Sequence, residues 1–268
     1  MRATKSIGNL FYLIALLLLA VIGAYGYLGT AAGHRDLAAV AEIEILGGEV
    51  EFDETKPNAP VMGVNFCGTD VTDTGLVHLK ELTELRYLFL LGTPVTDTGL
   101  VHLAGLTDLS SLSLEYTQVS DAALVHVKEL TNLRILLLTR TNVTNAGLLH
   151  LKELTELRYL CLARTQLTDT GLEHLKELTN LERLEIHHTQ VTDAGLVDLE
   201  ELTELQTLCL AHTQVTDSGL VHLEGLTKLR ILDLYHTEVT DEGVNKLKQA
   251  LPNCEISTDR RPLIDPLR

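Results

Sequence analysis

The sequence predicts an α/β solenoid, with short parallel strands on a concave side and helices on the convex side. The first observation is a motif, Val-Thr-Asp-Thr-Gly-Leu, that begins at Val71 and returns at Val95 after 24 residues. Further copies of the motif begin without insertion or deletion at Val119, Val143, Leu167, Val191, Val215 and Val239. The second observation is that leucines occupy fixed positions in these copies. A strict period of about 20–29 residues with such leucines is typical of a repeat solenoid.

Each repeat, called a coil below, is expected to contain one short strand. In the coil that includes residues 85–106, Leu88 and Leu90 flank Phe89, and apolar residues that recur with period two predict a strand. The leucines then point inward, while the residues between them point outward. We call the outward side of the resulting sheet the sheet face.

A helix is expected to follow the strand and a turn. Thr96 and Asp97 supply N-cap chemistry, and leucines recur at every third position over 100–106, on one helical face. One coil cannot bury its leucines alone, but stacked coils can. Strands stack about 4.7–4.9 Å apart and helices about 8–10 Å apart, so the stack should bend with the sheet on the inside.

The repeat resembles a known family. Its pattern is Leu85-x-x-Leu88-x-Leu90-x-x-Thr93-x-Val95, followed by a Gly-Leu helix. It is similar to the leucine-rich-repeat family, and specifically to bacterial arrays written LTxLxxLxLxxTxVTDxGLxxL, which are common in planctomycetes. The resemblance implies a right-handed α/β horseshoe. Asp-x-Gly-Leu repeats also resemble those of F-box substrate receptors, although the F-box itself is missing.

Threonine follows the strand in every coil, where many family members carry Asn or Cys. The threonines are Thr69, Thr93, Thr117, Thr141, Thr165, Thr189, Thr213 and Thr237. A buried hydroxyl must form a hydrogen bond, and neighbouring turns offer backbone partners. We therefore interpret this threonine column as structural.

The chain divides into four expected segments. Residues 1–34 are a membrane anchor or signal segment, 35–60 an N-terminal cap, 61–251 the array, and 252–268 a final strand with a loose tail. In the first segment, 10–28 is a mostly apolar run of nearly the length needed to span a bilayer of about 30 Å. These features predict one transmembrane helix, with the array on the extracytoplasmic side. The alternative is a cleaved signal peptide and a secreted or periplasmic protein.

Composition excludes several classes of function. The net charge is −16, from 21 basic and 37 acidic residues, so nucleic acid is not an expected partner. No phosphate-binding loop, dinucleotide fingerprint, zinc-protease motif or nucleophile elbow occurs in the sequence. We therefore expect no enzyme activity, no cofactor and no metal site.

Function is expected on the sheet face, because its residues differ from coil to coil while the inward leucines do not. Aromatic and apolar side chains there, accompanied by charged ones, are typical of an interaction surface. The candidate ligand-binding residues are Tyr87, Phe89, Leu137, Tyr159, Arg183, Glu185, His187, Asp233 and Tyr235.

A second candidate set, which we call the edge column, lies where the strands end. It consists of Arg140, Arg164, His188, His212 and His236. Imidazoles on neighbouring coils, about 5 Å apart, could approach a zinc ion or bind an anion when protonated. The other interpretation is a repeat position that merely tolerates histidine, and we favour it over a metal site.

The resulting hypothesis is a membrane-tethered binding scaffold that recognises a protein, peptide or glycan on its concave face. Two alternatives stay open. The array could be a structural or self-associating component of the cell envelope, or an intracellular adaptor of the F-box-receptor type.

Overall fold

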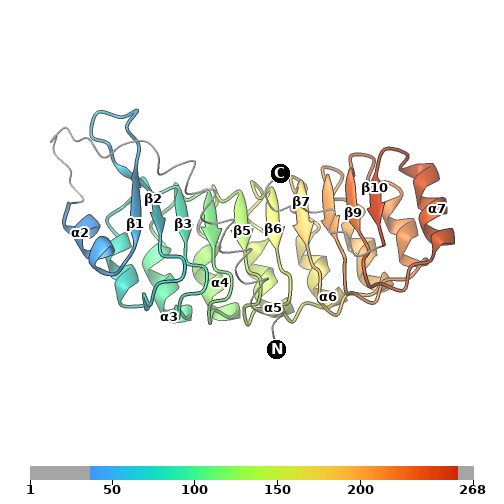
Figure 1. The fold of residues 1–268 in the computed structure, drawn as a ribbon, viewed down its shortest axis with the longest axis horizontal. Helices are drawn as coiled ribbons and strands as arrows, with labels where there is room; N and C mark the ends of the chain where they lie inside the picture. The colour runs from blue at the N-terminus through green and yellow to red at the C-terminus, as the bar shows by residue number, and fades with distance from the viewer. Residues whose placement is uncertain (1–36, 259–268) are drawn as a thin grey trace, which may run out of the picture.

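The computed structural model describes residues 37–258, which form one ten-stranded sheet backed by short helices (Figure 1). The strands are adjacent in chain order from β1 to β10. Their bounds are β1 Glu49–Phe52, β2 Val61–Asn65, β3 Tyr87–Phe89, β4 Ser111–Ser113, β5 Ile135–Leu137, β6 Tyr159–Cys161, β7 Arg183–Glu185, β8 Thr207–Cys209, β9 Ile231–Asp233 and β10 Glu255–Ser257. Successive coils therefore stack along one axis, and residues of equal repeat position form columns.

The sheet register follows the repeat. From β2 to β10 all pairs are parallel, and Leu88 on β3 lies opposite Leu112 on β4, one repeat away. At the far end, Ile256 on β10 lies opposite Leu232 on β9, the register that the spacing predicts. β1 pairs antiparallel with β2. Each strand from β3 to β10 has three residues, and its central residue is the inward one, so each coil contributes only these residues to the sheet.

The helical elements are equally short, and many are 3-10 helices. The α-helices are α2 Leu37–Ile45, α3 Asp97–Leu100, α4 Asp121–Val127, α5 Asn145–Leu148, α6 Asp169–Leu172 and α7 Asp241–Ala250. The 3-10 helices are η1 Gly75–Leu79, η2 Val101–Leu103, η3 Leu149–Leu151, η4 Glu173–Leu175, η5 Asp193–Leu199 and η6 Gly219–Leu223. The predicted helix around Leu100–Leu106 is thus one α-turn continued by a 3-10 turn, and Leu106 lies beyond it.

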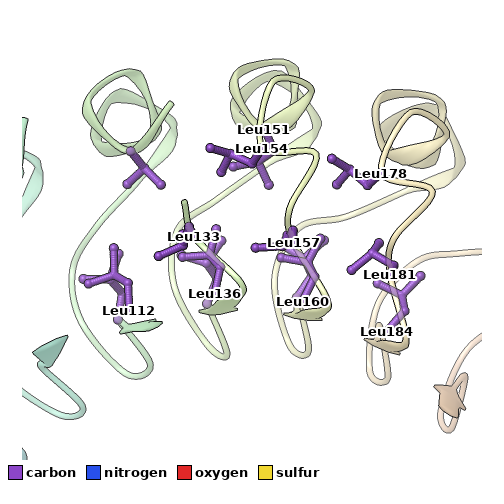
Figure 2. Packing of buried hydrophobic residues seen from close by; sticks show 14 of the residues in the cluster. Leu112, Leu133, Leu136, Leu151, Leu154, Leu157, Leu160, Leu178, Leu181 and Leu184 are labelled. Atoms are coloured by element: carbon purple, nitrogen blue, oxygen red, sulfur yellow. The ribbon is translucent and has the colours of Figure 1, made fainter. Parts of the chain in front are cut away.

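The core lies between the sheet and the helices. Figure 2 shows leucines from strands, such as Leu136 and Leu160, facing leucines from the helical side, such as Leu151 and Leu154. All four are fully buried. Burial of one such side chain stabilises the fold by about 1.5–3 kcal/mol. Because each leucine contacts the coils before and after it, the core is one continuous column rather than a set of separate clusters.

An acidic column joins each coil to the next. The Asp169 carboxylate at the start of α6 accepts hydrogen bonds from the backbone N–H and hydroxyl of Thr192 in the following coil, at 2.7 and 2.8 Å. Equivalent bonds are formed by Asp73, Asp97, Asp121, Asp193 and Asp217. A Cβ on Gly195 would lie 2.6 Å from an Asp169 oxygen, so glycine leaves room for the carboxylate. We call these six aspartates, with Asn145 in the same position, the aspartate column.

The threonine column is structural, but its partners differ from those expected. Each threonine hydroxyl donates to the backbone carbonyl three residues earlier in its own coil, at 2.6–2.8 Å. The expectation of a partner in a neighbouring turn is therefore wrong. The bond closes the turn after each strand. In most coils the same carbonyl also accepts the threonine's own backbone N–H, as the Leu90 carbonyl does from Thr93 at 3.2 Å, so hydroxyl and backbone donors share one acceptor.

The predicted transmembrane helix and single-pass membrane placement are corrected by the structure. Within residues 37–258, no helix is long and apolar enough to cross a bilayer. The longest, α7, has 10 residues, whereas a spanning helix needs about 20. The segment 10–28, on which that prediction rested, lies outside the described residues.

Candidate functional site on the sheet face and the edge column

The structure places the predicted sheet-face residues on one surface, but it covers them more than expected. Most of them are half-buried, while Glu185 and Asp233 are buried at 8% and 6% exposure. The aromatic side chains Tyr87, Phe89 and Tyr159 are therefore only partly exposed. Strands in a parallel sheet lie about 4.8 Å apart, so long side chains on adjacent strands cover one another.

The sheet-face residues fall into two groups. Tyr87 and Phe89 lie together on β3, while Leu137 lies on β5, and the small Ser111 and Ser113 of β4 separate them. This group is apolar and lacks a charged residue among the predicted ones. The second group spans β6 to β9 and holds all the charged candidates.

Glu185 is the centre of the second group. Its Oε1 accepts hydrogen bonds from the Tyr159 hydroxyl at 2.8 Å and from Arg183 Nε at 2.8 Å, and Arg183 Nη2 lies at 2.6 Å. The Arg183 guanidinium also lies 4.7 Å from the centre of the Tyr159 ring. These contacts fix the carboxylate, because three donors converge on a single oxygen.

The other carboxylate oxygen of Glu185 is much less occupied. Among the described residues, Oε2 has contacts only at 3.7 Å, with the thiol of Cys161 and with His187 Nε2. A sulfhydryl is a weak donor, and 3.7 Å is long for an ion pair. The site can therefore accept one further strong donor at Oε2.

Burial dominates the electrostatics of this group. It raises the pKa of the Asp233 carboxyl, and it raises the pKa of Glu115, which follows β4. Burial and the neighbouring Glu185 raise the pKa of the Tyr159 phenol, which stays protonated and donates. Three carboxylates on one buried surface would be stabilised by a cation from outside.

The edge column has a backbone conformation that the sequence analysis missed. Arg140, Arg164, His188, His212 and His236 all have a left-handed φ between 56° and 58°, as does Tyr116 before them. In the first two coils this position holds Gly68 and Gly92, also with positive φ. Those two glycines were the signal in the sequence, since glycine favours this conformation.

The side chains of the edge column interact from coil to coil. The His188 and His212 rings stack with their centroids 3.9 Å apart, and the His212 and His236 centroids are 4.5 Å apart. An Arg164 guanidinium nitrogen lies 3.0 Å from His188 Nε2. Tyr235 packs edge-on against His212, with centroids 5.2 Å apart. The sheet face and the edge column thus meet at β9.

Three histidines here, His187, His188 and His212, are difficult to protonate. Burial, Arg164 and the neighbouring imidazoles lower the pKa of His188 to about 4. Burial also lowers the pKa of His187, against the opposing effect of Glu185, and burial and His236 lower that of His212. At neutral pH these rings are therefore uncharged and can stack.

The arrangement is unsuitable for a metal ion. Across residues 37–258, no group of three or more His, Cys, Asp or Glu side chains could hold one. The reason lies in the stacking of His188 on His212, at an interplanar angle of 28°. Imidazole lone pairs lie in the ring plane, so nearly parallel rings do not direct them at one point.

Comparison with known proteins agrees with the repeat. The family model described as Leucine Rich repeat matches residues 225–248. Among solved structures, an internalin (InlF) of Listeria monocytogenes is 26% identical over 69% of this chain and 57% of that one, with a TM-score of 0.55. An internalin C2 of the same species is 23% identical over 83% and 92% of the two chains, with a TM-score of 0.61.

A leucine-rich-repeat protein of Leptospira interrogans is 23% identical over 68% of this chain and 45% of that one, with a TM-score of 0.56. The chain thus spans little more than half the length of InlF and less than half of the Leptospira protein. A comparison with curated proteins finds no match.

These findings agree with the fold of a leucine-rich-repeat solenoid. The chain is therefore similar to bacterial leucine-rich-repeat proteins, as the repeat pattern predicts.

Proposed function

We propose that the chain binds a protein or peptide on its sheet face, without making or breaking a covalent bond. The observation that carries this proposal is the half-occupied carboxylate of Glu185. It is buried and held by Tyr159 and Arg183, yet its Oε2 has no strong donor among the described residues. A rigid acceptor of this kind is pre-organised for a ligand, because its own side chain is already ordered.

The electrostatics favour a basic side chain of the partner as that donor. The buried Asp233 and the half-buried Glu115 both have a carboxyl with a raised pKa on the same face, and the whole chain has a net charge of −16. A lysine or arginine in the ligand would offset the desolvation of these groups. Half-buried Tyr87 and Phe89 add apolar area and ring faces that attract a cation. Tyr159, whose ring already lies against Arg183, adds apolar area.

The proposal is tested by selecting peptides from a random display library on the full-length protein. We expect the retained peptides to share Lys or Arg beside an apolar residue. Glu185→Gln should weaken their binding about tenfold or more, as expected when a charge-assisted bond of about 1.5–3 kcal/mol is lost. Alanine at Tyr87, Phe89 and Tyr159 together should weaken it further.

The matched control is Glu201→Gln, which removes the same charge from an exposed position on the helical side. Equal binding by Glu185→Gln and the control would contradict the proposal. The proposal would also be contradicted if the protein self-associated with increasing concentration and retained no peptide from the library.

A further inference from the structure

The edge column carries two uncompensated cations, Arg140 and Arg164, on an acidic protein. Arg140 interacts with the Tyr116 ring, 5.6 Å from its centre, and Arg164 interacts with His188. Neither arginine forms an ion pair with a carboxylate anywhere in residues 37–258, although the chain has 37 acidic residues. Two neighbouring guanidinium groups without an anion form a local region of positive potential.

The backbone gives the side chains of the edge column a regular spacing. Five successive coils place a basic or imidazole side chain at the same left-handed position, so the groups recur at the strand spacing of about 4.8 Å. Arg140, Arg164 and His236 are exposed, and His188 and His212 are half-buried. A linear ligand with one acidic group per repeating unit would meet one of these side chains in each coil.

An amide column runs beside the edge column, two residues further along the five coils from Tyr116 to His212, while the coil of His236 has the exposed Glu238 at that position. It consists of Gln118, Asn142, Gln166, Gln190 and Gln214, all exposed. The side chains of Gln166, Gln190 and Gln214 have no hydrogen-bond partner in the described part of the chain, whereas the Asn142 amide donates to the carbonyl of Gln118. Free amides both donate and accept, which suits the hydroxyl groups of sugars.

We propose that the edge column and the amide column bind a linear acidic polysaccharide, with carboxylate or sulfate groups on the cations and hydroxyl groups on the amides. The proposal uses different residues from those that carry the peptide site, so either can fail alone. Arginine pairs well with such planar or tetrahedral anions, and aromatic faces such as Tyr116 pack against sugar rings.

Binding is coupled to protonation of the histidines. The groups that face His188 are Arg164, His187, His212 and His236, with Glu185, Asp233 and the Tyr235 ring nearby. The cations among them oppose a proton on His188, while an anion seated on the column would favour it. Since the bound state then takes up protons, linkage requires that binding tighten as the pH falls from 7.5 to about 5.5.

The experiment measures binding of the full-length protein to dextran sulfate and to polygalacturonate at pH 7.5 and 5.5, at one fixed salt concentration. We expect both polymers to bind, with neutral dextran not bound, and affinity to increase about tenfold at the lower pH. Arg140→Asn with Arg164→Asn should abolish binding at both pH values, since asparagine tolerates the left-handed conformation without the charge. Replacing His188 and His212 by asparagine should remove only the pH dependence.

The matched control is Arg134→Gln with Arg230→Gln, which removes two exposed arginines from the opposite ends of the strands. Equal loss of binding in this control would overturn the proposal, as would binding of polyglutamate as tightly as either polysaccharide. If the arginine variant does not fold, a measurement on the wild-type protein still tests the proposal. The pKa of His188, measured from the NMR resonances of its imidazole ring, should rise on addition of dextran sulfate. An unchanged pKa would overturn the coupling between binding and protonation.

Discussion

The aspartate column and the edge column both run the length of the array, but only one is uniform in sequence. In the aspartate column each carboxylate is bound by the next coil through two hydrogen bonds, and aspartate stands at every position except Asn145. At the repeat position of the edge column the backbone is equally uniform, with φ between 56° and 72°, yet the side chains range from the glycines of the first two coils to tyrosine, arginine and histidine.

The difference between the two columns shows at which repeat positions the residue type can vary without loss of the fold. A column is constant when its side chains hold neighbouring coils together, and it varies when only the backbone conformation is required. The edge column even carries bulky residues in a conformation that costs about 1–2 kcal/mol for an L-residue. Retaining such side chains where glycine would fit suggests that they are used, which is why we place a ligand there.

The largest expected effect is on the free energy of unfolding, and it is measured by replacing leucine with alanine at one buried and one exposed position. Leu160→Ala, at a fully buried position, should reduce the free energy of unfolding by about 2–5 kcal/mol. Leu149→Ala, at 48% exposure on the helical side, should have a far smaller effect. Urea unfolding of both variants tests this, and equal losses would mean that the leucine column is not the main source of stability.

The next effect concerns the aspartate column. Asp169→Ala should cost about 1–3 kcal/mol, because the backbone N–H and hydroxyl of Thr192 lose their acceptor in a partly buried site. Asp198→Ala is the matched control, since Asp198 forms no side-chain hydrogen bond or ion pair within residues 37–258. A loss in the control as large as that of Asp169→Ala would show that the inter-coil bonds contribute little.

A smaller effect depends on pH. The pKa of His188 is lowered from 6.5 to about 4, so the unfolded chain binds more protons than the folded chain between these values. Stability from this group is present above pH 6.5 and is lost as the pH falls towards 4. His188→Asn should therefore flatten the fall in stability between pH 7 and pH 5, measured by urea unfolding at each pH. An unchanged slope would contradict the assignment.

The smallest expected effect on stability comes from a substitution in the edge column, and it tests the contrast with the aspartate column. Arg164→Gly should leave stability within about 0.5 kcal/mol of the wild type, because relief of the left-handed conformation offsets the entropy of glycine in the unfolded chain. Thermal unfolding is the measurement. A large destabilisation would mean that Arg164 supports the fold as the aspartates do, and the distinction between the two columns would then disappear.

The sequence predicted the fold well because the contacts that define it recur at one distance along the chain. Leu88 lies opposite Leu112, and Ile256 opposite Leu232, as the period requires. Short-range sequence patterns also identify the threonine turns. The prediction of a membrane-spanning helix came from residues outside this repeat, and it is wrong for the part of the chain that the structure describes.

The site was predicted only as a set of residues. That Tyr159, Arg183 and Glu185 lie near one another follows from their columns, but the convergence of three donors on one oxygen depends on side-chain rotamers, which no pattern fixes. The stacking of His188 on His212 depends in the same way on the left-handed backbone. Gly68 and Gly92 in the same column could have indicated that conformation.

The inter-coil bond of Asp169 to Thr192 has a consequence for the history of such a protein. Almost every coil presents the same aspartate acceptor to the coil that follows it. Recombination between two coils in register would therefore add or delete one whole repeat and leave the inter-coil hydrogen bonds at the junction intact. The chain can therefore change length in steps during evolution, while the exterior of each new unit is free to diverge.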